Sequence, residues 1–324
     1  MDNYCTGTVS NKFDAIIDRN VYEKHNINIV AKIKECHVII ANKLDCEILH
    51  SKKMIIICER YDSTSIGSSP NDYSHKKVIA IFKDFLPRDT KLLLADTVSK
   101  RYHYGLLKRI YGTDTPFDKP RTDKQKYINK FKQVSWGLPQ YSHLPINKHM
   151  VYCNEHKNNE KNIDVFCICH DHDDKKELAM HRKDIKEKLH LITNDGHKVI
   201  TGEGYGAREF HDALLQSKIC VSPWGIGERI ATDQKAILSG CVLVKPDCDF
   251  VKTFPDLYHA ANYVACKQDL SDLVEICLDI LKNYDKYLLR TRNAQALLHN
   301  TTRKEYINNF CSKVKEVYEE HTKK

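Results

Sequence analysis

Short apolar runs alternate with segments of helical periodicity through the second half of the chain. Residues 163–169 form an apolar run of strand length, and residues 175–192 place leucine and isoleucine at helical spacing. The alternation continues through strand-like segments at 197–201, 219–222, 241–244 and 263–266, and through helical segments at 207–217, 228–238 and 270–281. Strands that alternate with helices of this length predict a parallel sheet with helices on both faces, which is a Rossmann-like domain.

The first half of the chain shows the same pattern less clearly. Residues 54–58 and 78–82 have the character of central strands, and a polar loop follows each of them. The predicted fold class is therefore α/β, with two Rossmann-like domains that face each other across a cleft. After Asn300, apolar residues at helical spacing predict a C-terminal helix that packs back across the domain boundary; they are Tyr306, Phe310, Val314 and Val317.

A polar stretch separates the two halves. Residues 154–162, NEHKNNEKN, contain no apolar side chain and lead directly into an apolar run, so a linker is expected there. The predicted division is an N-terminal domain over 1–153, the linker 154–162, a second domain over 163–300 and the C-terminal helix over 301–324. The length of 324 residues agrees with two domains of roughly 150 residues each.

Composition narrows the class of protein further. The apolar runs fall far short of the roughly 20 residues that cross a bilayer, and the first residues hold no signal-type apolar stretch, so a cytoplasmic protein is expected. The 13 cysteines form no C-x-x-C pair and are odd in number, which favours reduced thiols. A net charge of +8 is compatible with a phosphate-bearing partner, either a nucleotide or a nucleic acid.

One turn between a predicted strand and a predicted helix carries candidate chemistry. The strand 219–222 leads into Pro-Trp-Gly-Ile-Gly at 223–227, and the next helix begins at about Glu228. Unpaired backbone amides in such a turn favour a phosphate or diphosphate, and the guanidinium of Arg229 would be a charged clamp. Turns of this kind also occur without a ligand, so both interpretations stay open.

The order of these segments resembles a known family. A strand ending in Ser-Pro-Trp-Gly, then Gly-Glu and a helix, then Ser-Gly-Cys-Val-Leu-Val-Lys-Pro-Asp and Thr-Phe-Pro-Asp-Leu-Tyr, resembles the donor-binding half of GT-B glycosyltransferases. The resemblance is to exostosin-like and family-1-like enzymes of bacteria and large DNA viruses. It covers about residues 163–281, is most specific over 214–258, and does not extend in detail to the first 150 residues.

This resemblance implies a transferase that uses a UDP- or GDP-sugar and needs no metal. The second domain would hold the nucleotide, the first the glycan or glycoconjugate acceptor. The loop 225–229 would face the donor diphosphate, Glu228 would lie at the sugar or ribose end, and residues 202–208 would line the base. The donor-binding residues implied in this way are Gly204, Tyr205, Arg182, Pro223, Trp224, Gly225, Ile226, Gly227, Arg229, Thr232, Asp233 and Lys235.

Two features of this helix depart from the family pattern. Lys235 and Ala236 stand where a second acidic residue usually grips the ribose, and Thr232 stands where many relatives carry a basic residue. These departures put the ribose and phosphate contacts in doubt. Lys235 is either a replacement phosphate partner or an ordinary exposed helix residue.

Glycosyl transfer with inversion also needs a group that accepts the proton of the attacking hydroxyl. Asp62 and Asp84 each follow a predicted strand of the first half and are candidates for this base, with Glu59 and His75 as weaker alternatives. An aspartate in such a loop also commonly caps a turn or helix. Glu228 completes the set of catalytic candidates, and a retaining enzyme would need no base.

These residues bear on three candidate functions. A metal-independent glycosyltransferase is the main hypothesis, and the alternative is a non-catalytic module that binds a nucleotide sugar or glycan and keeps the same fold. A nucleic-acid-binding protein lacks a recognisable motif here, so no nucleic-acid partner is expected. The segment HDHDD at 170–174 has no further ligands at zinc spacing and favours a solvated turn over a metal site.

Overall fold

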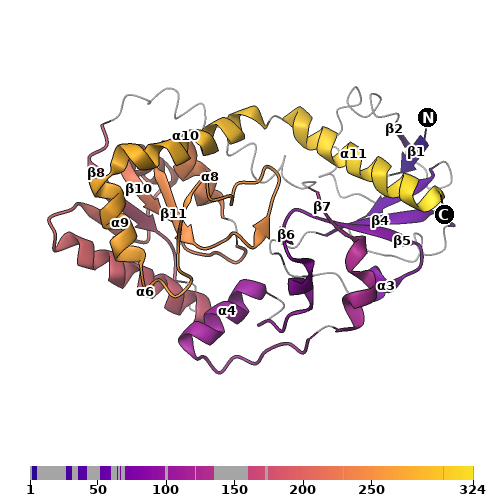
Figure 1. Ribbon diagram of the computed structural model, residues 1–324, viewed down its shortest axis with the longest axis horizontal. Helices are drawn as coiled ribbons and strands as arrows, with labels where there is room; N and C mark the ends of the chain where they lie inside the picture. Colours follow the sequence, from indigo (N-terminus) through magenta and orange to yellow (C-terminus); the bar gives the residue numbers. More distant parts are fainter. Residues whose placement is uncertain are drawn as a thin grey trace.

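The computed structural model describes most of the chain in two lobes (Figure 1). The described residues are 2–5, 27–30, 36–41, 52–59, 64, 66, 70–98, 101–120, 122–134, 160–171, 174–228, 230–301 and 303–323. Of the predicted linker 154–162, only residues 160–162 are among them. Within this part of the chain no helix is long and apolar enough to cross a membrane.

The first lobe is built on a parallel sheet of short, valine- and isoleucine-rich strands. Its described strands lie in the order β2-β1-β3-β4-β5-β7. They are β1 (Asp2–Cys5), β2 (Ile27–Val30), β3 (Val38–Ala41), β4 (Met54–Glu59), β5 (Val78–Lys83) and β7 (Phe131–Gln133). Their apolar side chains alternate between the two faces, as the two-residue period of a strand requires.

Helices from distant parts of the sequence cover the two faces of this sheet. On one face, Val38, Ile40 and Ile56 pack against the C-terminal helix α11 (Arg303–Thr322). On the other lie α3 (Pro70–Ser74) and the 3-10 helices η2 (Thr90–Leu94) and η3 (Thr122–Lys130). Figure 1 shows α11 crossing from the second lobe to the first, as the sequence predicts.

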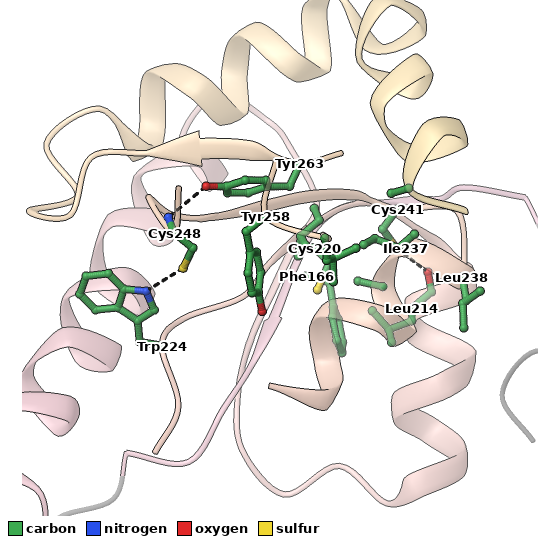
Figure 2. Packing of buried hydrophobic residues seen from close by; sticks show 14 of the residues in the cluster. Phe166, Leu214, Cys220, Trp224, Ile237, Leu238, Cys241, Cys248, Tyr258 and Tyr263 are labelled. Carbon is green, nitrogen blue, oxygen red and sulfur yellow. Dashed lines mark hydrogen bonds between the residues drawn. The ribbon is translucent and has the colours of Figure 1, made fainter. Parts of the chain in front are cut away.

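The second lobe contains another parallel sheet, in the order β13-β11-β10-β8-β9. Its strands are β8 (Ile163–Ile168), β9 (Val199–Gly202), β10 (Ser217–Val221), β11 (Val242–Pro246) and β13 (Val264–Cys266). One face packs on α6 (Lys176–Thr193) and α9 (Leu273–Lys282). The other face, shown in part in Figure 2, packs on α7 (Ala207–Leu215), α8 (Ala231–Leu238) and α10 (Tyr284–Asn300).

The strand order of the second sheet marks a preferred binding position. Numbered within the lobe, the strands lie in the order 2-1-3-4-5, so the direction of winding reverses between β8 and β10. In open α/β sheets, ligands bind beyond the carboxyl ends of the strands at such a reversal. The loops that follow β8 and β10 are therefore the expected walls of a site.

Helix α4 (Tyr102–Tyr111) belongs to the first half of the sequence but packs on the second lobe. Its Tyr104 and Leu107 join the core that contains Trp224, and it runs beside α6. The short strands β6 (Leu86–Pro87) and β12 (Val251–Lys252) pair antiparallel between the two halves of the chain. Elements from the first half of the sequence therefore contact elements from the second half in both places.

The predicted fold class is confirmed: the chain is α/β, with two parallel sheets each covered by helices on both faces. Most predicted elements of the second half are present within a few residues of their expected bounds. Helix α8 begins at Ala231 rather than near residue 228, because Gly227 and Glu228 remain in the loop. The cysteine side chains that the structure describes, from Cys36 to Cys311, are buried.

Candidate functional site

The loop after β10 is anchored in the core of the second lobe. Its buried members are Pro223, Trp224, Gly225, Gly227 and Glu228. Ile226 is exposed, with 36% of its surface accessible. The Trp224 indole Nε1 donates to the Cys248 thiol at 3.2 Å (Figure 2), and the ring stacks on His181 with 5.4 Å between centroids. The main chain of this loop is therefore held at a defined position beyond the sheet edge.

Two cationic side chains of the second lobe bind carbonyl groups of the loop. Lys245, at 0% exposure, donates from Nζ to the Pro223 carbonyl at 3.1 Å. Arg182, on α6, donates to the Trp224 carbonyl from Nε at 3.2 Å and from Nη2 at 3.1 Å. Burial lowers the pKa of Arg182. Burial, followed by the nearby charges of Lys245 and Arg182, lowers the pKa of His181 to about 3, so His181 is neutral. Arg182 thus stabilises the loop, whereas the family resemblance implies that it contacts the sugar donor.

The start of α4 supplies two more basic side chains to the same loop. His103 places Nε2 3.2 Å from the Gly225 carbonyl, and Arg101 donates from Nη1 to the Ile226 carbonyl. Four successive carbonyls, from Pro223 to Ile226, are therefore each bound by a basic side chain. Two buried carboxylates, Glu228 and Asp233, lie among the same basic groups.

Glu228 is fully buried where the loop meets both α4 and the first lobe. Its Oε1 lies 3.2 Å from His103 Nδ1 and accepts a hydrogen bond from the Thr64 hydroxyl at 2.7 Å. Its Oε2 accepts from the Thr64 amide at 3.1 Å. Burial by itself raises the pKa of Glu228, but the contacts with His103 and Thr64 outweigh it and hold the pKa at about 2. Glu228 is therefore ionised at neutral pH.

Asp233 has a different position from the donor contact that the sequence suggests. It is at 0% exposure, and its carboxylate accepts from the Tyr258 hydroxyl, from the Ser222 hydroxyl and, at 3.2 Å, from the Ile230 amide. Lys245 Nζ lies 3.4 Å away. Because protein groups surround this carboxylate, Asp233 ties the start of α8 to the end of β10 and is closed to a ligand in this arrangement.

Packing inside the protein explains Gly225. A Cβ atom at this position would stand 2.2 Å from Cγ2 of Ile230, a distance that real side chains do not adopt. The sequence interpretation, in which glycine lets a ligand approach the main chain, is corrected at this residue: the Ile230 side chain fills that space.

The segment after β9 lies at the surface of the same sheet edge. Gly204 has a φ of +84°, a left-handed conformation that favours glycine, and Tyr205 is 39% exposed. Glu203 accepts from the Asp171 amide at 2.7 Å and pairs with His170 and Lys186, which brings the loops after β8 and β9 together. Contacts with His170, then Asp171, lower the pKa of Glu203 to about 2. Tyr205 is thus available to a ligand at this edge.

The remaining residues of the predicted donor site lie on α8 or outside the described residues. Thr232 is partly exposed. Lys235 is half-buried with its Nζ 5.5 Å from the centroid of the Phe210 ring, and burial lowers its pKa. Arg229 lies outside the described residues, so its proposed clamp on the diphosphate stays a prediction.

Of the two main candidates for the catalytic base, the structure describes one. Asp62 lies outside the described residues. Asp84 directly follows β5 and is partly buried, and its carbonyl accepts from the Gln133 amide at 3.3 Å. At the adjoining strand ends Glu59 and Lys83 form a buried ion pair of 3.0 Å. Asp84 therefore occupies the sheet edge that the sequence predicts, and its role as base is untested.

Sequence reasoning missed the residues that complete the loop. His103, Arg101 and Thr64 contact it from more than 120 positions away. No local motif surrounds them. Among the described residues no group of three or more histidine, cysteine, aspartate or glutamate side chains is arranged to hold a metal ion, and His172 and Asp173 lie outside that part of the chain.

No protein-family model matches the chain, and no curated protein matches it significantly. Solved structures that resemble it include glycosyltransferases. An α-glucosyltransferase in complex with UDP-glucose and DNA containing an abasic site has 10% identity and a TM-score of 0.43 over 98% of this chain and 99% of that chain. A glycosyltransferase from Rickettsia africae has 9% identity and a TM-score of 0.44 over 98% of each chain.

TarM has 9% identity and a TM-score of 0.45 over 85% of this chain. The match spans only 54% of TarM, about half its length. At these identities and TM-scores, the likenesses carry no conclusion about activity.

Proposed function

We propose that this chain is a GT-B glycosyltransferase that moves a sugar from a nucleoside diphosphate sugar to a hydroxyl of a glycan or glycoconjugate, without a metal. The observation that supports it most directly is the set of basic side chains around the loop after β10, at the reversal point of the second sheet. Fixed cationic groups at such a position stabilise the negative charge that develops on a leaving diphosphate.

Glu228 supports the same proposal from the sugar side. Thr64 presents a hydroxyl and an amide to its carboxylate, and a sugar hydroxyl is a donor of the same kind. We propose that the sugar of the donor takes the place of Thr64 when the two lobes admit it. Tyr205, which is 39% exposed at the same sheet edge, then lies on the approach to the loop and is a group that can contact the nucleotide.

On this proposal the acceptor lies at the carboxyl edge of the first sheet. Asp84 stands there and is the described candidate for the base, with Asp62 as the second. A base must lie within hydrogen-bond reach of the attacking hydroxyl. Replacing Asp84 by asparagine then lowers transfer and leaves nucleotide binding unchanged.

A non-catalytic binding module of the same fold is the second candidate. Two observations favour it: Lys235 stands where an acidic ribose contact is expected, and Glu228 is already engaged by Thr64 and His103. Such a module would bind the nucleotide sugar and leave it intact.

A thermal-shift screen with UDP, GDP and their sugars tests the proposal, with ATP as the mismatched nucleotide. A ligand at about 100 times its dissociation constant adds about 2.7 kcal/mol to the free energy of unfolding, which is readily measured. Stabilisation by one nucleotide sugar is expected. If none of these compounds stabilises the chain, a UDP- or GDP-sugar is not its donor.

Turnover separates the enzyme from the binding module. With the stabilising sugar nucleotide, the enzyme releases nucleoside diphosphate, and Glu228→Ala abolishes the release. Glu187→Ala is the matched control because Glu187 lies on the exposed side of α6. Binding without release of diphosphate, even with glycan acceptors present, would favour the module.

A further inference from the structure

His103 stands at the one place where α4, the loop after β10 and Glu228 meet among the described residues. The residue is at 0% exposure, and so is Glu228. Its ring packs edge-on against Trp224 and Tyr104, with 5.8 Å and 4.6 Å between ring centroids. These aromatic contacts fix the plane of the imidazole, so each ring nitrogen has a single direction.

Both ring nitrogens face acceptors. Nε2 lies 3.2 Å from the Gly225 carbonyl, which can only accept, so Nε2 carries a proton. Nδ1 lies 3.2 Å from Glu228 Oε1 as an ion pair that is not well aligned as a hydrogen bond. The ring therefore contacts the loop carbonyl with one nitrogen and faces the Glu228 carboxylate with the other.

We propose that His103 is a positioning residue of this site, which holds the Glu228 carboxylate aimed along the loop so that it recognises the sugar part of the donor. This inference rests on the proposed function. Thr64 supplies the other donors to Glu228, and His181, Arg182 and Lys245 are the further basic groups packed around the loop. Of these, His103 is the one that reaches both the loop carbonyl and Glu228.

Two conservative variants separate the two contacts of His103. An asparagine amide nitrogen occupies nearly the position of Nδ1, and a glutamine amide nitrogen that of Nε2. His103→Asn therefore keeps a donor toward Glu228 and loses the one toward Gly225, whereas His103→Gln does the reverse. His197→Gln is the control. His197 pairs with Asp164 at 3.5 Å at the amino end of the second sheet, on the side opposite to the loop after β10.

The measurement is the dissociation constant, by calorimetry, of the stabilising nucleotide sugar and of its nucleoside diphosphate alone. The ratio of the two constants reports what the sugar contributes. His103→Gln and Glu228→Gln are each expected to reduce this contribution by about tenfold or more, with little change for the diphosphate. His103→Asn and His197→Gln are expected to preserve it within about threefold. The double variant His103→Gln with Glu228→Gln should lose no more than either single variant.

Other outcomes overturn the inference in distinguishable ways. If His103→Asn loses the sugar contribution as fully as His103→Gln, or if neither loses it, His103 does not act through Glu228. If the wild-type chain binds none of the nucleotides, the proposed function itself fails. The pairing is then judged from denaturant unfolding of the same single and double variants, where additive losses would contradict it.

Discussion

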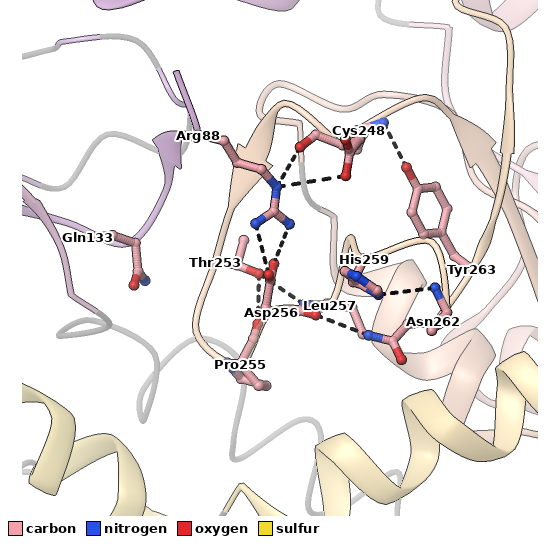
Figure 3. Close-up of polar contacts among 12 residues, drawn as sticks. Arg88, Gln133, Cys248, Thr253, Pro255, Asp256, Leu257, His259, Asn262 and Tyr263 are labelled. Atoms are coloured by element: carbon pink, nitrogen blue, oxygen red, sulfur yellow. Dashed lines mark hydrogen bonds and ion pairs between the residues drawn. The ribbon is translucent and has the colours of Figure 1, made fainter. Parts of the chain in front are cut away.

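Arg88 and Asp256 form a bidentate ion pair between the first and second halves of the chain (Figure 3). Arg88 Nη1 lies 2.9 Å from Asp256 Oδ2, and Nη2 lies 2.8 Å from Oδ1. Arg88 Nε also donates to the Asp249 carbonyl at 2.6 Å, next to the paired strands β6 and β12. The parallel geometry of a guanidinium and a carboxylate fixes direction as well as distance.

Removing this ion pair should loosen the connection between the lobes at small cost. The side chains are 31% and 40% exposed, so solvent screening limits the coupling free energy to about 1 kcal/mol. A double-mutant cycle with Arg88→Ala and Asp256→Ala, followed by urea denaturation, measures this coupling free energy. Arg88→Lys should keep only part of it, because lysine cannot form a bidentate contact with the carboxylate. Arg109→Ala, which breaks a pair with Asp96 that does not involve Asp256, is the control. Strictly additive losses would show that the two residues do not interact.

Glu228 should make stability fall at acid pH. Its pKa is held at about 2 in the folded chain, below the ordinary value of 4.5, so its contribution is present above about pH 4.5 and is lost as the pH falls toward 2. The contribution has an upper limit of about 3 kcal/mol. Urea midpoints between pH 6 and pH 3 should fall less steeply for Glu228→Gln than for the wild-type chain and Glu187→Gln. Parallel slopes for all three chains would contradict the low pKa.

The buried pair of Asp233 and Lys245 should be costly to break from one side. Asp233→Ala leaves the Lys245 ammonium buried without its carboxylate, and the expected loss of unfolding free energy is about 3–5 kcal/mol. Asp212→Ala, in an exposed pair with Arg208 on α7, should cost less than about 1 kcal/mol. Urea denaturation compares the two. Similar small losses would mean that Asp233 is not the anchor of α8.

Phe310 should anchor α11 to the first sheet. Its ring packs edge-on against Phe82 at 5.8 Å and is 2% exposed, so Phe310→Ala should lower the free energy of unfolding by about 3–5 kcal/mol. Lys313→Ala, at a partly exposed position of the same helix, should change it by less than about 0.5 kcal/mol. A small effect at Phe310 would show that the helix contributes little to the first lobe.

Local patterns predicted the elements well because they depend on short-range chemistry. The apolar run at 163–169 and the helical spacing at 175–192 correspond closely to β8 and α6. The predicted α8 began too early because Glu228 is a good helix former by composition, yet its side chain is bound by Thr64 and His103 outside the helix. Tertiary contacts decided that boundary.

The site was less predictable because its contacts are distant in sequence. The motif at 223–227 located the loop, but nothing near it indicates that its carbonyls meet Arg101 and His103. The acidic side chain of Asp233 suggested a ligand contact, and only the fold shows that Tyr258 and Ser222 enclose it. A sequence without aligned relatives gives no sign of such pairings.

The exchange of helices between the lobes has a consequence for how the molecule comes apart. Because α4 completes the core beside Trp224 and α11 covers the first sheet, a break at 154–162 would leave each fragment with an apolar surface that its missing helix normally shields. Neither fragment carries all of its own core. The chain therefore has to assemble and melt as a single cooperative unit, even though it displays two sheets.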